Sequence, residues 1–223
     1  MIKRLKFSEV SFTDIKQCVQ LSEQNTENYQ WDDAALIILS EREIWLINQI
    51  VGHIQDLPVH LLNEATIWAR AIYPLLMLSE TKMIRAWSEF SLSCQYKLFL
   101  LEGVVDGVLG KSYAGRMDAP YLVVIEAKRG IDAQSPVAQC YAQMLAAARL
   151  NWEQDNCQPQ EIFGCYTIAD TWTFIRAELE NIDSDKPIMR LETSREYVEK
   201  LEAETIVRIL KKIVLSKTTK EAK

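Results

Sequence analysis

The stretch Tyr121-Leu-Val-Val-Ile-Glu-Ala-Lys128 is an apolar run that ends abruptly in two charged side chains. Its aliphatic and β-branched residues predict a buried β-strand. Because side chains alternate along a strand, Glu126 and Lys128 should point to one face, with Ile125 and Ala127 on the other. A buried strand does not normally carry two charges on one face without a partner or a metal ion. This stretch therefore predicts a sheet whose core is apolar and whose strand end carries a functional site.

A second isolated acid lies upstream, within the apolar segment Gly103-Val-Val-Asp-Gly107. If the two segments are neighbouring strands, Asp106 and Glu126 converge. Two carboxylates held together repel each other, and a divalent cation relieves that repulsion. Oxygen ligands favour Mg²⁺ or Mn²⁺ over zinc. Lys128 beside them would orient or activate a water molecule, or stabilise negative charge on a scissile phosphate.

The surrounding segments predict a mixed sheet with helices. An antiparallel meander is expected from residues 85–96, 98–109 and 121–128, followed by a helix that begins at Ser135-Pro136 and continues to Leu150. A hairpin is expected from residues 161–168 and 171–178, and a final helix near residues 193–215. This order is typical of an α/β domain with one sheet.

The part of the chain before about residue 80 is predicted to be helical, without strands. Asp32 and Asp33 are candidate N-caps of one helix, and residues 64–78 form a second that Pro74 should kink or end. We therefore expect an N-terminal helical extension at residues 1–60, a core at 61–192, and a C-terminal helix with a basic tail at 193–223.

The composition fits one domain with a substantial core, because 48% of the 223 residues are hydrophobic. No apolar run approaches the roughly 18 residues of a membrane span, and no apolar segment follows the basic N-terminus as in a signal peptide. A cytoplasmic protein without membrane contact is expected. Five scattered cysteines without a Cys-x-x-Cys pair, and only two histidines, argue against a zinc finger or a disulfide framework.

The net charge of −6 argues against a protein that grips nucleic acid by bulk charge alone. Residues 1–6 carry +3 and residues 208–223 carry +5, so the body between them is strongly acidic. This distribution fits a metal site, or a subunit whose partner protein handles DNA, and equally an ordinary solvated surface.

Three features together resemble the PD-(D/E)XK nuclease superfamily: Gly103-x-x-Asp106, Glu126-x-Lys128 ending an apolar strand, and a following helix with Gln139. The resemblance covers roughly residues 60–178 and is nearest to the restriction-type and recombination-exonuclease branches. It implies a restriction endonuclease-like sheet flanked by helices. It also implies that Asp106, Glu126 and the backbone carbonyl of Ala127 hold the metal, while Lys128 assists the attacking water.

The resemblance extends to further residues, each with a plainer alternative. Glu64 would complete the site from a helix before the sheet, as a ligand of the metal or through a water molecule, or it simply complements the dipole of that helix. Gln139 matches a Gln-x-x-x-Tyr motif in which Gln143 replaces the Tyr; its alternative is an exposed helix position. Gln143 and Arg129 are expected to contact nucleic acid, unless Gln143 only shares a helix face with Gln139 and Arg129 only lies at the surface.

The sequence thus predicts a Mg²⁺- or Mn²⁺-dependent endo- or exonuclease that hydrolyses phosphodiester bonds, most readily those of DNA. A protein partner and a homodimer are further expectations, the latter from the frequency of two-fold assemblies. The alternative is a catalytically silent subunit of the same fold that assembles with other proteins or binds nucleic acid.

Overall fold

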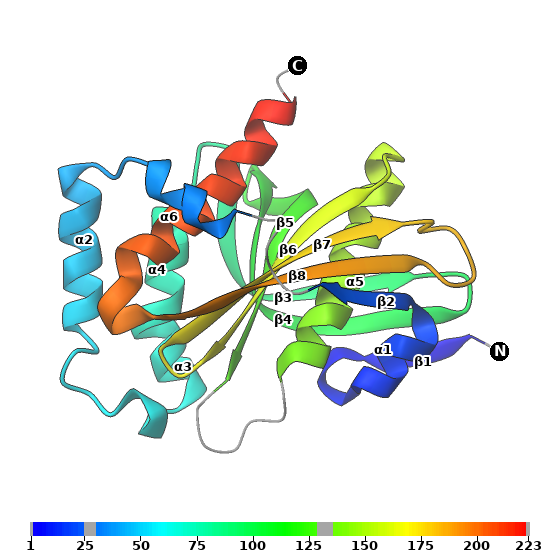
Figure 1. Cartoon of the computed structure of the whole chain (residues 1–223), viewed down its shortest axis with the longest axis horizontal. Helices are drawn as coiled ribbons and strands as arrows, with labels where there is room; N and C mark the ends of the chain where they lie inside the picture. Colours follow the sequence, from blue (N-terminus) through cyan, green and yellow to red (C-terminus); the bar gives the residue numbers. More distant parts are fainter. Residues whose placement is uncertain (1, 25–29, 129–135, 222–223) are drawn as a thin grey trace.

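One mixed sheet of eight strands forms the centre of the molecule (Figure 1). The computed structural model describes residues 2–24, 30–128 and 136–221. The sheet order is β1-β4-β5-β6-β7-β8-β2, and β3 also pairs with β4. The strands are β1 (Lys3–Lys6), β2 (Gln20–Gln24), β3 (Ile84–Gln95), β4 (Phe99–Tyr113), β5 (Arg116–Lys128), β6 (Gln160–Ile168), β7 (Thr171–Glu180) and β8 (Ile188–Val198). The predicted α/β class is confirmed.

Helices cover both faces of this sheet (Figure 1). The helices are α1 (Phe12–Cys18), α2 (Glu41–Gly52), α3 (Glu64–Ile67), α4 (Tyr73–Leu78), α5 (Pro136–Asp155) and α6 (Glu199–Glu221), with the short turns η1 (Phe7–Glu9), η2 (Trp31–Leu36), η3 (Val59–Leu61) and η4 (Trp68–Ile72). One apolar core joins α2, α4 and α6 to the sheet, and a second core on the other face joins α1 and α5 to it. In the described part of the chain, no helix is both long and apolar enough to cross a bilayer.

The central connections follow the sequence prediction. β3, β4 and β5 form an antiparallel meander, and β6 and β7 form a hairpin that turns at Ala169-Asp170. β5 and β6 are parallel, and α5 lies between them in the chain, as a parallel pair requires a crossover connection. The strand that ends in Glu126 and Lys128 therefore lies inside the sheet, between β4 and β6.

Helix α5 is buried along most of its length, which explains its many small residues. Cys140 and Met144 lie directly against the backbone of β6 at Gly164: a Cβ atom there would be 2.8 Å from the Cys140 sulfur and 2.4 Å from that of Met144. Only glycine permits this approach. The close contact fixes the distance between α5 and the strands on which the charged residues lie.

Two expectations for the N-terminal part are wrong. β1 and β2 are strands, paired in parallel with β4 and β8, where only helix was expected. Each is short and pairs with a strand far away in the sequence, so no local alternation marks it. The expected helix start at Asp32 and Asp33 is also wrong: these residues lie in the turn η2, and α2 begins after Ser40, whose side chain forms a reciprocal capping box with Glu43.

The start of the expected C-terminal helix is wrong as well. Residues 193–198 belong to β8, which pairs antiparallel with β7, and α6 begins only at Glu199. Sheet pairing overrides the apparent helical spacing, and Leu201, expected on the apolar side, is 81% exposed.

Pro74 does not interrupt the helical path between Glu64 and Leu78. The chain accommodates Pro74 with the π-helical turn η4, in which the N–H of Tyr73 donates to the carbonyl of Trp68, five residues earlier. A wider turn removes the need for the N–H that proline lacks. It also directs Trp68 toward the sheet, where its indole N–H donates to Ser88 Oγ at 2.8 Å.

Candidate active site

The site lies where β4 separates from β5. One edge of β4 pairs with β1 through residues 99–102 and with β5 from residue 107 onward. Asp106 lies in the gap between these two ladders. Asp106 fills the gap with its side chain: its Oδ2 accepts a hydrogen bond of 2.7 Å from the backbone N–H of Ala127. The carboxylate thus replaces a missing ladder bond and is held at the fork between the two strands.

Glu126 lies next to this fork and is fully buried. Its Oε2 accepts a hydrogen bond of 2.6 Å from the side-chain amide of Gln143 on α5. Its Oε1 forms an ion pair with the Lys128 ammonium at 2.6 Å, and the Lys128 side chain is 22% exposed. The alternation predicted for β5 therefore brings Glu126 and Lys128 together.

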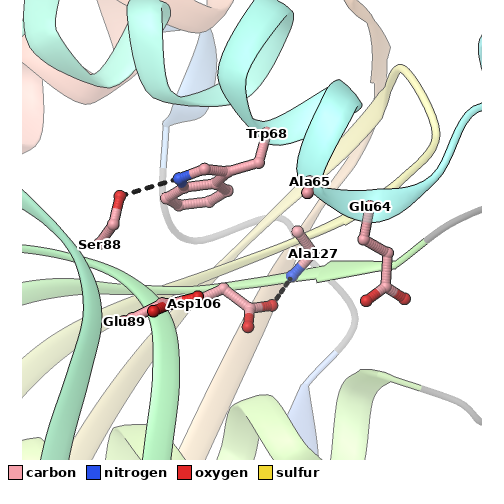
Figure 2. A pocket seen from close by; sticks show the side chains of 7 residues that line it. All are labelled: Glu64, Ala65, Trp68, Ser88, Glu89, Asp106 and Ala127. Carbon is pink, nitrogen blue, oxygen red and sulfur yellow. Dashed lines mark hydrogen bonds between the residues drawn. The ribbon is translucent and has the colours of Figure 1, made fainter.

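An open pocket of about 320 Å³ lies beside Asp106 (Figure 2). Figure 2 shows Glu64 and Glu89 on opposite sides of Asp106, with the Trp68 ring above. The lining residues are Glu64, Ala65, Trp68, Ser88, Glu89, Asp106 and Ala127. The pocket is large enough for a phosphodiester group with ordered water, and three of its seven lining residues are acidic.

Trp68 and Gly107 fit together at the wall of this pocket. A Cβ atom on Gly107 would lie 2.4 Å from Cη2 of Trp68, so the ring rests directly on the backbone of β4. The hydrogen bond to Ser88 fixes the orientation of the ring. Trp68 is therefore a rigid wall next to the Asp106 carboxylate.

The electrostatics of the site favour a cation. Burial and, to a smaller extent, the negative charge of Asp106 outweigh the opposing effects of Lys128 and Gln143 and together raise the pKa of Glu126 to about 7. The pKa of Asp106 is raised by burial and by Glu64 and Glu89, although the Ala127 N–H and Lys128 oppose the shift. Both carboxylates are thus costly to ionise without additional positive charge.

The pKa of Lys128 is raised too, and for a lysine this favours the charged form. Burial lowers its pKa, but the Glu126, Asp106 and Glu64 carboxylates outweigh burial and raise the pKa overall. The ammonium therefore keeps its proton at neutral pH. Such a group stabilises developing negative charge and cannot itself act as a general base.

The donors at the fork match a cation that prefers oxygen. N–H and C=O of one strand residue point to the same edge, so the Ala127 carbonyl points toward the gap that its N–H faces. Among the described residues no cluster of three or more His, Cys, Asp or Glu side chains has the arrangement of a metal site. Mg²⁺ commonly binds through one or two carboxylates and keeps several waters, so two carboxylates and a carbonyl suit it.

The structure brings most of the sequence-predicted residues together. Asp106, Glu64 and Ala127 line one pocket, and Glu126 and Lys128 form the adjoining ion pair. Gln139 is half-buried on α5, one helical turn before Gln143, and no hydrogen bond between it and the Glu126 network is found in the described ranges. Arg129 lies outside the described residues.

Two residues take positions that the sequence reasoning did not give them. Gln143, expected to contact nucleic acid, has no exposed surface and bonds to Glu126 instead. Glu89 was not singled out. The pairs Ser88 with Gly107 and Phe90 with Val105 place it opposite Asp106, so a correct strand register would have identified it.

Comparison with known proteins gives no identification: the chain matches no protein-family model and no curated protein.

Proposed function

We propose that this chain is a Mg²⁺-dependent nuclease of the restriction endonuclease-like fold that hydrolyses phosphodiester bonds of DNA. The observation that carries the proposal is the meeting of Asp106, Glu126 and Lys128 at the fork between β4 and β5, beside an open pocket. Two buried carboxylates with raised pKa values, next to a charged lysine, form a costly arrangement for a purely structural sheet.

Each residue has a defined task in this proposal. A divalent cation held by Asp106, Glu126 and the Ala127 carbonyl would polarise the phosphate and lower the pKa of a bound water. Lys128 orients that water and stabilises the charge that develops on the phosphate. Glu64, at the rim of the pocket, holds water molecules on the open side. Trp68 excludes bulk solvent from one wall.

The basic ends of the chain contribute less to DNA binding than their charge indicates. Lys3, Arg4 and Lys6 form ion pairs with Asp14, Glu102 and Glu9. At the other end Arg208, Lys211 and Lys212 pair with Glu204, Glu43 and Asp33. This pairing favours the second candidate function, a silent subunit of the same fold that works through a protein partner.

A cleavage assay tests the proposal directly. The parent protein is incubated with linear and circular DNA and with RNA, in Mg²⁺, Mn²⁺ or chelator. Asp106→Asn and Lys128→Met should each lower the cleavage rate roughly 100-fold or more. Glu102→Gln is the matched control, because it removes an acid from the same strand β4 away from the fork. Cleavage by Asp106→Asn at the parental rate would refute the proposal.

Calorimetry separates the two candidate functions. A catalytic site should bind Mn²⁺, and Glu126→Gln should abolish that binding. A folded parent protein that binds no Mn²⁺ and cuts no nucleic acid would instead support the silent subunit.

A further inference from the structure

Neither contact with nucleic acid nor apolar packing explains why residue 143 is a glutamine. It lies in the middle of α5 with no exposed surface, and its Nε2 donates to Glu126 Oε2 at 2.6 Å. The neighbouring Cys140 and Met144 side chains are pressed against the backbone of Gly164, so α5 cannot shift relative to β6. The position of the Gln143 amide is therefore set by the packing of the helix.

The chemistry of the amide fixes its orientation. When Glu126 is ionised, its Oε2 is an acceptor, and the NH₂ group of Gln143 faces it. The carbonyl oxygen Oε1 is then buried, and it has no hydrogen-bond partner within the described part of the chain. A buried acceptor without a partner destabilises the folded protein. Methionine has a similar length and would avoid this cost, but it would leave the buried Glu126 Oε2 without its donor.

We propose that Gln143 is a positioning residue for the metal site. Its amide occupies Oε2 of Glu126 and thereby leaves Oε1, the oxygen beside Lys128 Nζ, as the one that faces a divalent cation. Glu126 then binds through a single oxygen in one fixed orientation. The inference rests on the proposed function, because it assigns Gln143 a task only if Glu126 is a metal ligand.

The expected effect is on metal affinity. Outer partners that orient metal ligands typically contribute 10- to 100-fold to affinity or activity. Gln143→Met removes the donor, keeps the length of the side chain and removes the unpaired oxygen. We expect Mn²⁺ binding to weaken by about 10- to 100-fold in calorimetry, while the melting temperature in chelator changes little, because an unpaired Glu126 oxygen replaces the unpaired Gln143 oxygen.

Gln160→Met is the matched control. Gln160 is also a buried glutamine, but its amide donates to Asp155 and Cys157, away from the fork. This variant should melt at a lower temperature and bind Mn²⁺ as tightly as the parent protein. The two variants thus separate loss of a buried amide from loss of metal positioning.

Cleavage gives a second readout. In Gln143→Met, the Mg²⁺ concentration for half-maximal cleavage should rise by about the same factor as the dissociation constant, while the rate at saturating Mg²⁺ stays within a few-fold of the parent. A general loss of structure would lower the saturating rate instead.

The outcomes distinguish failure of this inference from failure of the proposed function. If the parent binds Mn²⁺ and Gln143→Met binds it equally well, Gln143 does not position Glu126. If the folded parent binds no Mn²⁺, the proposed function fails and this inference with it. Should Gln143→Met not fold, a Mg²⁺ titration of ¹⁵N-labelled parent protein decides: the Gln143 side-chain amide signal should shift with the calorimetric midpoint, and an unmoved signal overturns the inference.

Discussion

Glu199 provides a test of the electrostatics that is independent of any catalytic role. It is the first residue of α6 and is fully buried. Trp172 Nε1 donates to Glu199 Oε2 at 2.8 Å, and Oε1 has no hydrogen-bond partner in the described residues. Burial, with a smaller contribution from the charge of Asp170, outweighs the Trp172 bond and raises the pKa of Glu199 from 4.5 to about 7.

This shift makes stability depend on pH in a defined direction. Between pH 4.5 and about 7 the folded protein keeps a proton on Glu199 that the unfolded chain has lost, so the free energy of unfolding falls as pH rises. The stabilisation that protonated Glu199 gives is fully present below the pKa of the unfolded chain, 4.5. It is lost as the pH rises through the pKa of the folded protein, about 7. The shift corresponds to about 3 kcal/mol, most of it between pH 5 and 8.

Glu199→Gln removes this dependence, because the amide does not titrate. Between pH 5 and pH 8 the free energy of unfolding of the variant should therefore rise by about 2–3 kcal/mol relative to that of the parent. Urea unfolding followed by far-UV circular dichroism measures it, provided the slope m is unchanged. Glu196→Gln, an exposed acid on β8, is the baseline for the same substitution. A difference between Glu199→Gln and the parent that is constant over this range would refute the reasoning.

Three further predictions concern packing, capping and the site. Gly107→Ala should lower the free energy of unfolding by about 1–3 kcal/mol in urea, because its Cβ meets the Trp68 ring, and Trp68→Leu in the same chain should recover part of the loss; purely additive effects would contradict this contact. Ser40→Ala should cost about 1 kcal/mol through loss of the α2 capping box, again measured in urea, and an unchanged midpoint would show that the cap contributes nothing. Asp106→Asn should raise the melting temperature in chelator at pH 8, because the raised pKa of Asp106 in the parent means that its ionised carboxylate is disfavoured in the folded protein. Calorimetry of the same variant should find Mn²⁺ binding lost. A lower melting temperature with metal binding retained would reverse that interpretation.

The sequence predicts those elements whose signal is local. The β3–β5 meander, α5 and the β6–β7 hairpin each follow from alternation, apolar runs or turn residues within one segment. β1 and β2 were missed because four or five residues carry too little pattern, and their partners β4 and β8 lie far away in the chain. The start of the expected final helix, residues 193–198, was wrong because the end of β8 runs into α6 without a turn between them.

The residues of the site also differ in whether a local sequence pattern predicts their contacts. Strand alternation alone pairs Glu126 with Lys128, and the ion pair at 2.6 Å follows from it. The approach of Asp106 needed the further assumption that its strand is next to β5, which the ladder confirms. The bond from Gln143 to Glu126 depends on how closely α5 packs on the sheet, and no spacing along the chain gives that distance. Glu89 required the register between β3 and β4.

The path of the first 24 residues affects how the molecule is assembled. β1 lies beside β4 near one end of the sheet order and β2 lies beside β8 at the other, while η1 and α1 between them pack against α5. The Tyr141 hydroxyl of α5 adds a hydrogen bond of 3.2 Å to Glu23 of β2. During synthesis β2 cannot pair in the sheet until β8 has been made, so the ends of the described chain meet only late in synthesis. If β2 detaches first, it uncovers the edge of β8, and brief opening rather than global unfolding would then expose the protein to aggregation.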